Sequence, residues 1–185
     1  MQEFRRHIFA TDYGFAAIGW TARGIVAFRL PAPSHDEAER ALFKRHPSSA
    51  AAEPPEAVQG VIEAARCYFA GEVQDFSSIP VDLGAQEPLF LRIYDHVRKL
   101  GWGQTTTYGA VARDLGEEPQ AARVVGEAMA RNPVPLIIPC HRVLAAGGKI
   151  GGFSAPGGSE SKAHMLTLEG ALPAPPVQAQ IGFDF

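Results

Sequence analysis

Hydrophobic and polar residues alternate loosely along residues 5–30, a segment rich in Phe, Ile, Val and Thr. A period of two is typical of strands that bury one face. Turn-forming residues interrupt the alternation at positions 12–14 and again at 22–24. The segment therefore predicts two or three antiparallel strands.

The following segments change to helical spacing. Ser34 and Glu37 form a capping box, which predicts a helix that runs to about Arg45. Apolar residues then recur with a helical period from position 56 to Gly71, which predicts a second helix. A short strand is expected over residues 79–83. These elements predict a small α/β unit with an antiparallel sheet.

The second half of the chain has a mainly helical pattern. Apolar residues at helical spacing predict a helix from Pro88 that ends near Gly101. Two shorter helices, over residues 108–115 and 120–130, are separated by a tight turn and predict a helix-turn-helix. The apolar run 136–138 predicts a brief strand. A last helix is expected over residues 159–168.

The fold class that follows is α+β, with two domains. Residues 1–83 are expected to form an N-terminal α/β supporting domain. Residues 84–172 are expected to form a mainly helical, winged-helix-like domain that carries the helix-turn-helix. Residues 173–185 are rich in Pro and Ala and are expected to form a flexible tail.

Composition narrows the class of protein. The chain has 185 residues, of which 46% are hydrophobic and 20% charged, as expected of a globular protein and not of a disordered one. Its two cysteines exclude a disulfide framework and a multi-cysteine zinc site. No apolar run is long enough for a membrane helix, and Asp12 interrupts the stretch that a signal peptide needs. We therefore expect a cytoplasmic protein with no membrane contact. We also expect it to be a monomer and to use no cofactor.

The net charge of −3 argues against a general polyanion binder. Residues 84–172 carry a slightly positive balance, so a local nucleic-acid-binding face in the second half is compatible with the charge distribution.

Candidate chemistry is densest in residues 132–143. A cysteine thiol is a weak nucleophile until it ionises, and a neighbouring imidazole and guanidinium favour the thiolate. Consecutive side chains of an extended segment point to opposite sides, so Cys140 and His141 cooperate only if the backbone turns after Pro139 or a water bridges them. His141 also needs an orienting carboxylate. A buried cysteine beside a surface histidine fits the same pattern, and the spacing alone leaves both interpretations open.

The run Pro139-Cys140-His141-Arg142-Val143 resembles the active-site signature of the DNA–protein-cysteine alkyltransferases, which repair O6-alkylguanine. Further family motifs follow in the family's order: Thr107-Tyr108-Gly109, Ala121-Ala122-Arg123-Val124-Val125-Gly126, Met129, Asn132-Pro133, and Leu166 to Glu169-Gly170. The resemblance covers about residues 86–170, whereas the first 83 residues fit only the family's general plan.

The resemblance implies a direct-reversal repair reaction. Cys140 would attack the alkyl carbon of O6-alkylguanine in duplex DNA, and O4-alkylthymine is a possible second substrate. Because the thioether formed is not reversed, each molecule would react once. His141 would accept the thiol proton through a water, Glu169 would orient His141, and Asn132 would hold the local turn. Tyr108 would donate to the guanine as negative charge develops on the leaving base.

The resemblance also implies how DNA is held. The helix-turn-helix would enter the minor groove, and the damaged nucleotide would rotate out of the stack. Arg123 resembles the arginine that fills the vacated space, and small residues on the same helix would let the backbone approach the groove. The predicted DNA-binding residues are Thr107, Ala122, Arg123 and Gly126. The predicted substrate-pocket residues are Met129, Pro135, Val143 and Ser154, with Val143 offering its backbone to the base edge.

Two further expectations concern the ends of the chain. Some family members hold a structural zinc in the N-terminal domain, but Cys67 stands alone there beside two aromatic residues, so we expect it in the core and expect no metal. The last six residues resemble short peptides that dock on the bacterial sliding clamp, through Gln180, Ile181, Phe183 and Phe185. The alternative is a tail that folds back onto its own core.

Two other functions remain for comparison. A non-catalytic protein of the same fold, which binds alkylation lesions without repairing them, is the main alternative. In relatives of that kind, a tryptophan stands where the reactive cysteine would be. The cysteine at position 140 therefore argues against that function. A cysteine-dependent hydrolase would need an oxyanion hole, which nothing in the sequence specifically supplies.

Overall fold

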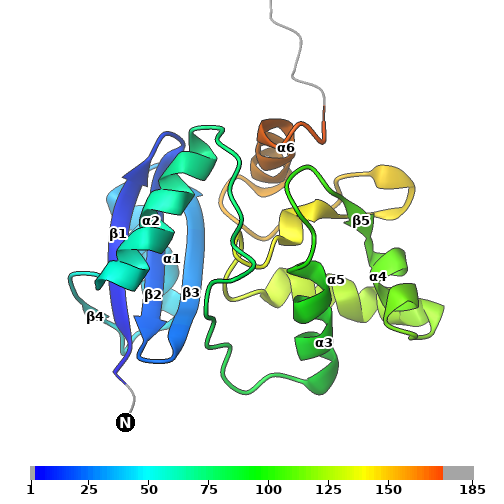
Figure 1. Ribbon diagram of the computed structural model, residues 1–185, viewed down its shortest axis with the longest axis horizontal. Coiled ribbons are helices and arrows are strands. Elements are labelled where there is room, and N and C mark those ends of the chain that lie inside the picture. The colour runs from blue at the N-terminus through cyan, green and yellow to red at the C-terminus, as the bar shows by residue number, and fades with distance from the viewer. Residues whose placement is uncertain (1–2, 173–185) are drawn as a thin grey trace, which may run out of the picture.

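The computed structural model describes residues 3–172, which form a half that contains a β-sheet and a mainly helical half (Figure 1). The sheet has the strand order β3-β2-β1-β4, with β1, β2 and β3 antiparallel and β4 parallel to β1. The elements of this half are β1 (Arg5–Thr11), β2 (Gly14–Thr21), β3 (Gly24–Ala32), α1 (His35–Arg45), β4 (Ala50–Ala51) and α2 (Glu56–Phe69). The predicted antiparallel strands and both predicted helices are present.

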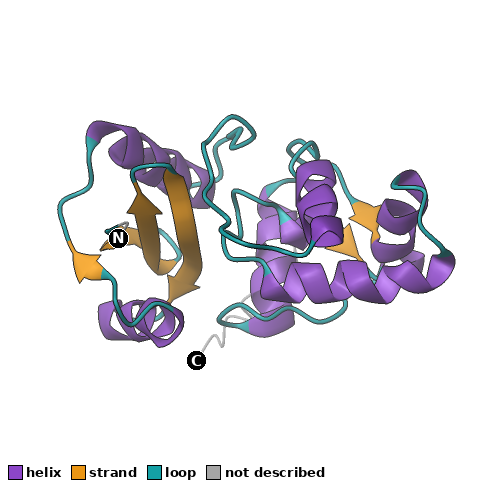
Figure 2. Cartoon of the chain, turned by 90° about the horizontal axis from the view of Figure 1, so that it is seen from below, coloured by secondary structure: helices purple, strands orange, loops and turns teal. Residues whose placement is uncertain are grey.

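The alternation along β2 explains how the two helices cover the sheet. Ala16 and Ile18 belong to the large core that also contains the buried face of α2. Ala17, between them, belongs to a smaller cluster that contains Ala38 and Leu42 of α1. Because successive strand residues face opposite sides, the two helices lie on opposite faces of the sheet (Figure 2).

The predicted start of α1 is confirmed in detail. The Ser34 hydroxyl accepts a hydrogen bond from the Glu37 backbone N–H at 3.3 Å, and the same hydroxyl donates to the Glu37 carboxylate at 3.3 Å. Both contacts belong to a capping box. Acidic residues in the first turn and basic residues in the last turn also suit the helix dipole.

The predicted strand over residues 79–83 is wrong. Only Val81 pairs, in an isolated parallel bridge to Ile25. Two backbone hydrogen bonds flank it: Ile25 N–H donates to the Pro80 carbonyl at 2.9 Å, and Asp82 N–H donates to the Ile25 carbonyl at 2.8 Å. Pro80 has no N–H to extend the ladder, so the segment crosses the sheet edge without joining it.

The helical half contains the predicted helix-turn-helix, formed by α4 and α5, which pack against each other and against α3. A two-stranded parallel sheet, β5-β6, was not expected from the sequence. The elements are α3 (Pro88–Val97), β5 (Thr106–Thr107), α4 (Tyr108–Asp114), a 3₁₀ turn η1 (Pro119–Ala121), α5 (Ala122–Arg131), η2 (Cys140–Arg142), β6 (Val143–Leu144), η3 (Ala146–Gly148) and α6 (Gly158–Leu168). The predicted α+β class, with a mainly helical second half, is confirmed.

The predicted strand over residues 136–138 is also wrong. These residues form a turn in which Leu136 adopts a left-handed conformation with φ of 77°. Only an isolated bridge joins Pro135 and Ile138. The run is apolar because it is buried between the two halves, not because it belongs to a sheet. Periodicity does not separate these two causes over three residues.

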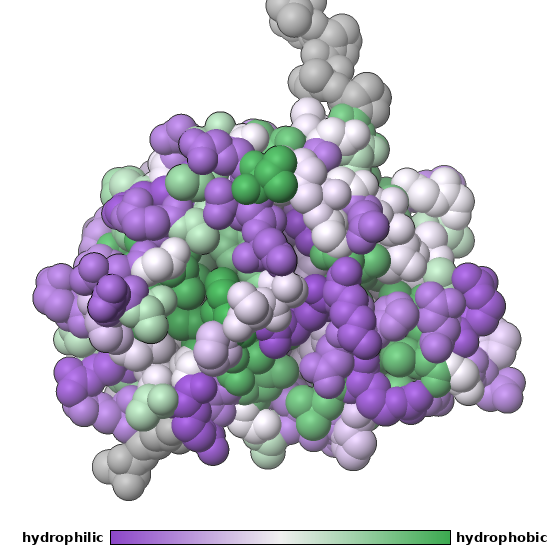
Figure 3. All heavy atoms as spheres, in the orientation of Figure 1, coloured by the Kyte–Doolittle hydropathy of each residue, from purple (hydrophilic) through white to green (hydrophobic). Residues whose placement is uncertain are grey.

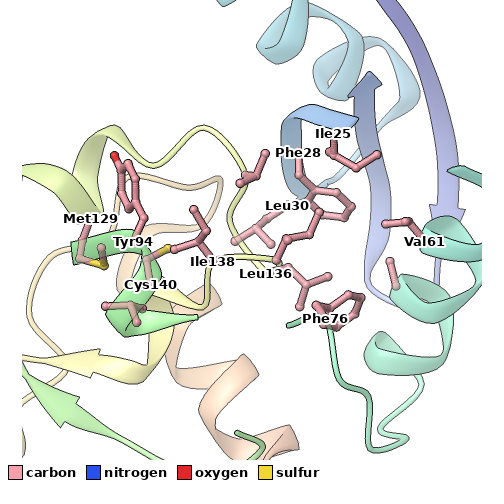
Figure 4. Close-up of a cluster of buried hydrophobic side chains, with 14 of the residues drawn as sticks. Ile25, Phe28, Leu30, Val61, Phe76, Tyr94, Met129, Leu136, Ile138 and Cys140 are labelled. Atoms are coloured by element: carbon pink, nitrogen blue, oxygen red, sulfur yellow. The ribbon is translucent and has the colours of Figure 1, made fainter. Parts of the chain in front are cut away.

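One hydrophobic core spans both halves. Figure 4 shows Phe28 and Leu30 of β3 meeting Leu136 and Ile138, and the same cluster continues to Cys140. A backbone hydrogen bond of 3.0 Å from Phe28 N–H to the Pro133 carbonyl joins the halves directly. Because the core is shared, a domain boundary at residue 83 stays a prediction.

The surface is mostly polar on the face shown in Figure 3, with hydrophobic side chains gathered where the two halves meet. No helix among residues 3–172 is both long and apolar enough to cross a membrane.

Candidate active site

The backbone turns at Cys140. Cys140 and His141 lie on η2, a single 3₁₀ turn that begins directly after Pro139. This is the turn that the sequence requires if thiol and imidazole are to cooperate. The Cys140 N–H donates to the Ile138 carbonyl at 2.8 Å, which fixes the start of the turn.

Asn132 holds the segment that leads to Cys140. Its side-chain Nδ2 donates to the Ile138 carbonyl at 2.8 Å, and its Oδ1 accepts from the Val134 N–H at 3.0 Å. Asn132 is buried, so both hydrogen bonds form away from water. The side chain therefore closes the loop that carries the left-handed Leu136.

Glu169, at the end of α6, is the centre of a buried polar network. Its Oε1 lies 2.7 Å from Nε2 of His141 and 2.9 Å from Nη2 of Arg142. Its Oε2 accepts from Nε of Arg142 at 2.9 Å and from the Gly103 N–H at 3.2 Å. A fifth contact comes from α2, because the Tyr68 hydroxyl donates to Oε1 at 2.8 Å. Glu169 and His141 have fully buried side chains.

The charge state of this network follows from its contacts. Burial alone raises the pKa of Glu169, but hydrogen bonds from His141 and Arg142 lower its pKa to about 2. Burial lowers the pKa of His141 and outweighs the opposing effect of Glu169. The imidazole is therefore neutral beside an ionised carboxylate, which requires Nε2 to carry the proton that it donates to Glu169. Nδ1 is then the free acceptor, and it has no hydrogen-bond partner among residues 3–172.

Cys140 as a whole is only 5% exposed. Burial raises the pKa of Cys140, while a hydrogen bond from Asn132, the charge of Lys162 and nearby backbone N–H groups act in the opposite direction. The resting group is therefore a protonated thiol whose thiolate has stabilising partners in place. A base is needed to remove the proton at neutral pH.

Lys162 of α6 is a buried cation beside this turn. Its Nζ donates to the Val143 carbonyl at 2.7 Å and lies 5.8 Å from the centroid of the Tyr108 ring. The residue is 1% exposed. Burial lowers the pKa of Lys162, and the nearby Cys140 raises it.

Two cavities meet at Cys140. One, of about 400 Å³, is lined by Tyr108, Ser154 and Lys162, and it opens beside Gly126 of α5. The other, of about 570 Å³, lies between the two halves of the chain and reaches β3 and α1. Met129, Cys140, Phe153 and Ser154 line both. The thiol thus lies where the two spaces adjoin.

The structure brings most of the predicted pocket residues to these cavities. Met129 and Ser154 line both, and Pro135 lines the larger one. The Ser154 hydroxyl donates to the Ala130 carbonyl at 3.2 Å. Val143 lines neither cavity: it is fully buried, and its carbonyl accepts from Lys162. Its contact with a base edge stays a prediction.

The pairing of β5 with β6 explains why Tyr108 reaches the cysteine. Thr106 pairs with Val143 and Thr107 with Leu144, so the start of α4 lies beside the end of η2. The Thr107 hydroxyl accepts from the Ala110 N–H at 3.2 Å and thereby caps α4. Burial and the nearby Cys140 raise the pKa of Tyr108, so its hydroxyl keeps its proton and is a donor.

The predicted DNA-binding residues of α5 lie on its accessible side. Arg123 is exposed, and Ala122 and Gly126 are half-buried. A Cβ atom at Gly126 would meet no atom within 4 Å, so this stretch of the helix surface is open. The geometry is compatible with close approach by a ligand backbone, and the DNA contacts themselves stay predictions.

Several groups of the site have no signal in the local sequence. Tyr68 reaches Glu169 from a helix 101 residues earlier, and the Gly103 N–H comes from a loop 66 residues away. No local pattern signals such contacts. Lys162 is the cation near the thiol, whereas Arg142 is held by Glu169. The sequence around Lys162 mixes apolar and polar residues, so it does not indicate that this lysine is buried.

Two further expectations concern the rest of the chain. Cys67 is half-buried, not in the core as expected, although Tyr68 and Phe69 beside it are buried. Within residues 3–172 no group of three His, Cys, Asp or Glu side chains is placed to hold a metal ion. The predicted sliding-clamp residues, Gln180, Ile181, Phe183 and Phe185, lie outside the described residues.

Comparison with known proteins identifies the family. Residues 88–171 match the family model of the 6-O-methylguanine DNA methyltransferase DNA-binding domain. A Thermus thermophilus protein named DNA base-flipping protein is 41% identical over 134 residues, 72% of this chain and 85% of that protein. A methylated-DNA–protein-cysteine methyltransferase of Mycolicibacterium paratuberculosis is 39% identical over 117 residues, 63% of this chain and 68% of that protein.

Solved structures agree over almost the whole chain. The crystal structure of Mycobacterium tuberculosis OGT in complex with DNA superposes with a TM-score of 0.70 at 29% identity, and the match covers 90% of this chain and 92% of that one. The similarity thus extends through the sheet-containing half as well as the helical half. The chain belongs to the O6-methylguanine-DNA methyltransferase family, the methylated-DNA–protein-cysteine methyltransferases.

Proposed function

We propose that this protein repairs O6-alkylguanine in duplex DNA by transferring the alkyl group to Cys140. The observation that carries the proposal is the arrangement of one thiol at two adjoining cavities, on the same turn as a neutral histidine that is hydrogen-bonded to an ionised Glu169. A nucleophile, a base and an orienting carboxylate are the parts that displacement by a thiol requires.

The proposed reaction is an in-line displacement. The Cys140 proton passes through a bridging water to Nδ1 of His141, the acceptor left free by the bond to Glu169. The thiolate forms a bond to the alkyl carbon, and the bond from that carbon to guanine O6 breaks. The electron pair leaves on the guanine, which regains a proton on its ring. The Tyr108 hydroxyl stabilises the leaving base as a hydrogen-bond donor.

The helical half presents the lesion to the thiol. The smaller cavity opens beside α5, so we propose that the base leaves the stack and enters there, between Tyr108 and Ser154. Arg123 is exposed on the same helix and would fill the vacated place in the duplex. Thr107, Ala122 and Gly126 would lie along the groove. Met129 and Pro135 would form apolar walls around the alkyl group.

The reaction consumes the protein. A thioether offers no easy leaving group, so Cys140 is not regenerated and each molecule reacts once. We propose the same reaction for O4-alkylthymine, because its alkyl group is likewise carried by an exocyclic oxygen of the base.

Intact mass is the direct test. The protein is incubated with duplex DNA that contains O6-methylguanine, and the chain is then weighed and mapped. The expected result is one added methyl group on Cys140, and no addition to Cys140→Ser. Cys67→Ser is the matched control and should react like the wild type. Methylation of both cysteines, or of neither, would contradict the proposal.

A lesion-binding role without chemistry is the second candidate, because a relative with 41% identity is named DNA base-flipping protein. The same experiment separates the two functions. Tight binding of the O6-methylguanine duplex with an unchanged mass would favour the second candidate. Cys140 and its connected His141 and Glu169 support the transfer reaction.

We further propose that the protein acts as a monomer in the cytoplasm and that its last six residues contact the sliding clamp. The clamp proposal depends on the sequence alone, since these residues lie outside those described. Deletion of residues 180–185 should abolish binding to purified clamp and leave methyl transfer to Cys140 intact. Equal clamp binding by the deletion variant and the full chain would contradict the proposed contact.

A further inference from the structure

The larger cavity at Cys140 has a cationic far wall. It runs from the thiol toward the sheet-containing half, where Arg29 of β3 and Lys44 and Arg45 of α1 line it. No acidic residue is among the described residues that line this cavity. Lys44 and Arg45 form no ion pair within residues 3–172. Three positive charges thus face one space without a counter-charge.

Arg29 is the unusual member of this wall. It is 9% exposed, and its guanidinium is hydrogen-bonded on one side only. Nη1 donates to the Phe28 carbonyl at 3.0 Å and to the Pro133 carbonyl at 3.4 Å, whereas Nη2 has no partner among the described residues. A buried donor left unsatisfied is costly, and a charged one more so.

The charge of Arg29 persists despite this environment. Burial and the neighbouring Arg45 lower the pKa of Arg29 to about 10, so the group remains protonated at neutral pH. An anion in the cavity would offset both effects and supply an acceptor for Nη2. Guanidinium groups bind carboxylates through strong, charge-assisted hydrogen bonds.

The position of the cavity indicates what such an anion is attached to. The base is proposed to enter the smaller cavity, beside α5, with its alkyl carbon at Cys140. Any part of the alkyl group beyond that carbon then extends into the larger cavity, toward Arg29. In this arrangement a backbone phosphate would stay with the duplex outside the smaller cavity.

We propose that Arg29, Lys44 and Arg45 form an anion subsite that favours alkyl groups ending in a carboxylate, such as that of O6-carboxymethylguanine, over neutral groups of the same shape. The inference rests on the proposed function. In the reaction, the Cys140 sulfur bonds to the methylene carbon, the bond from this carbon to O6 breaks, and the thiol proton leaves through His141. The products are S-carboxymethylcysteine at position 140 and guanine, which takes up one proton on its ring.

The test compares two adducts of nearly the same shape. Single-turnover rates are measured on duplexes with O6-carboxymethylguanine and with O6-carbamoylmethylguanine, in which a neutral amide replaces the carboxylate. The readout is the ratio of the two rates within each protein, so a general loss of activity or stability cancels. Arg29→Gln should lower this ratio roughly ten- to a hundredfold, as expected for a lost charge-assisted hydrogen bond.

Two further variants make the result decisive. Arg40→Gln changes the same charge at an exposed position of α1 that does not line the cavity, and it should leave the ratio unchanged. The double variant Lys44→Gln/Arg45→Gln changes two exposed side chains and should lower the ratio about threefold, since exposed charges are screened. If Arg29→Gln fails to fold, the double variant decides. An unchanged ratio in the folded variants overturns the subsite.

Free modified bases show whether the bound anion is the carboxylate of the adduct or a phosphate of the DNA. With the free modified bases, which carry no phosphate, the same fall in the ratio is expected. If the three cations bind a DNA phosphate instead, Arg29→Gln will slow both duplex adducts equally and leave the free bases unaffected. Failure of the wild type to accept methyl from O6-methylguanine would overturn the proposed function itself, whereas methyl transfer with an unchanged ratio overturns only the subsite.

Discussion

Replacing Glu169 by Gln should destabilise the protein strongly at neutral pH and much less in acid. The carboxyl has a pKa of about 2 in the folded chain, compared with 4.5 for the unperturbed group. This difference corresponds to about 3 kcal/mol of folding free energy. The carboxylate accepts hydrogen bonds from His141, Arg142, Tyr68 and the Gly103 backbone, and neutralising it removes the negative charge that strengthens them and one of the two acceptor oxygens.

The sign follows from the direction of the pKa change. A carboxyl whose pKa is lower in the folded state binds its proton less tightly there, so it stabilises the fold above its unfolded pKa. That contribution is complete at pH 7 and falls to about 1 kcal/mol at pH 3, since the folded group is then close to its own pKa. Below about pH 2 it is gone.

The substitution removes at pH 7 the negative charge that protonation of Glu169 removes from the wild type in acid. Glu169→Gln keeps the shape of the side chain but leaves the buried Arg142 without a carboxylate, which should cost about 3–5 kcal/mol. At pH 3 the wild type has lost about 2 kcal/mol of the same stabilisation, so the gap between the two proteins should narrow by that amount.

Urea denaturation of both proteins at pH 7 and pH 3 measures this gap. The control is Glu117→Gln, which breaks a surface pair with Arg92 whose side chains are 30% and 51% exposed. Its cost should stay below about 1 kcal/mol. The reasoning is refuted if the gap for Glu169→Gln is the same at both pH values, or if Glu117→Gln costs as much.

Three further variants test other parts of the site. In urea denaturation, Tyr68→Phe should lower the free energy of unfolding by about 2 kcal/mol, and Tyr94→Phe by about 1 kcal/mol. The difference is expected because Tyr68 donates to a carboxylate, whereas the equally buried Tyr94 donates to a backbone carbonyl. Equal costs would contradict the charge-assisted contact. Lys162→Met should raise the pKa of Cys140, so the pH profile of its reaction with iodoacetamide should shift upward, and an unshifted profile would mean that the lysine does not act on the thiol. Arg123→Ala should slow repair of duplex O6-methylguanine far more than reaction with free O6-benzylguanine, and equal losses would exclude a role in holding the extruded base.

The parts of the fold that sequence predicts well are those with a local physical cause. The period of two in β2 directs Ala16 and Ile18 to one side and Ala17 to the other, and the Ser34 cap needs only its own first turn. The two wrong strands lack such a cause. The segment around Pro80 takes its conformation from Ile25 of β3, more than fifty residues earlier, and the turn at Leu136 packs against the other half of the chain. No window of neighbouring residues describes such contacts.

The candidate site divides in the same way. The Cys140 motif predicts the need for a turn and for a carboxylate, because these follow from the chemistry of a thiol and an imidazole. Tyr68 and Lys162 were not predicted, since a tyrosine and a lysine within amphipathic helices have the same local pattern whether they face the core or solvent. Their roles depend on which elements meet, and that is settled only by the packing of α2 and α6 against the turn.

The sheet-containing half is therefore more than a support for the reactive half. It supplies Tyr68 to the carboxylate that is hydrogen-bonded to His141, and it supplies Arg29 to the far wall of the larger cavity. A protein that consumes its nucleophile in one reaction gains from keeping that thiol protonated and enclosed until a substrate arrives, because a freely exposed thiolate would react with other electrophiles. Burial of Cys140 between the two halves provides this protection, while Asn132 and Lys162 lower the cost of ionisation at the moment of transfer. Cys140 must be protected from other electrophiles and yet ionise readily during transfer. Enclosure of this residue by two separate parts of the chain meets both requirements, and it gives the sheet-containing half a role in the chemistry.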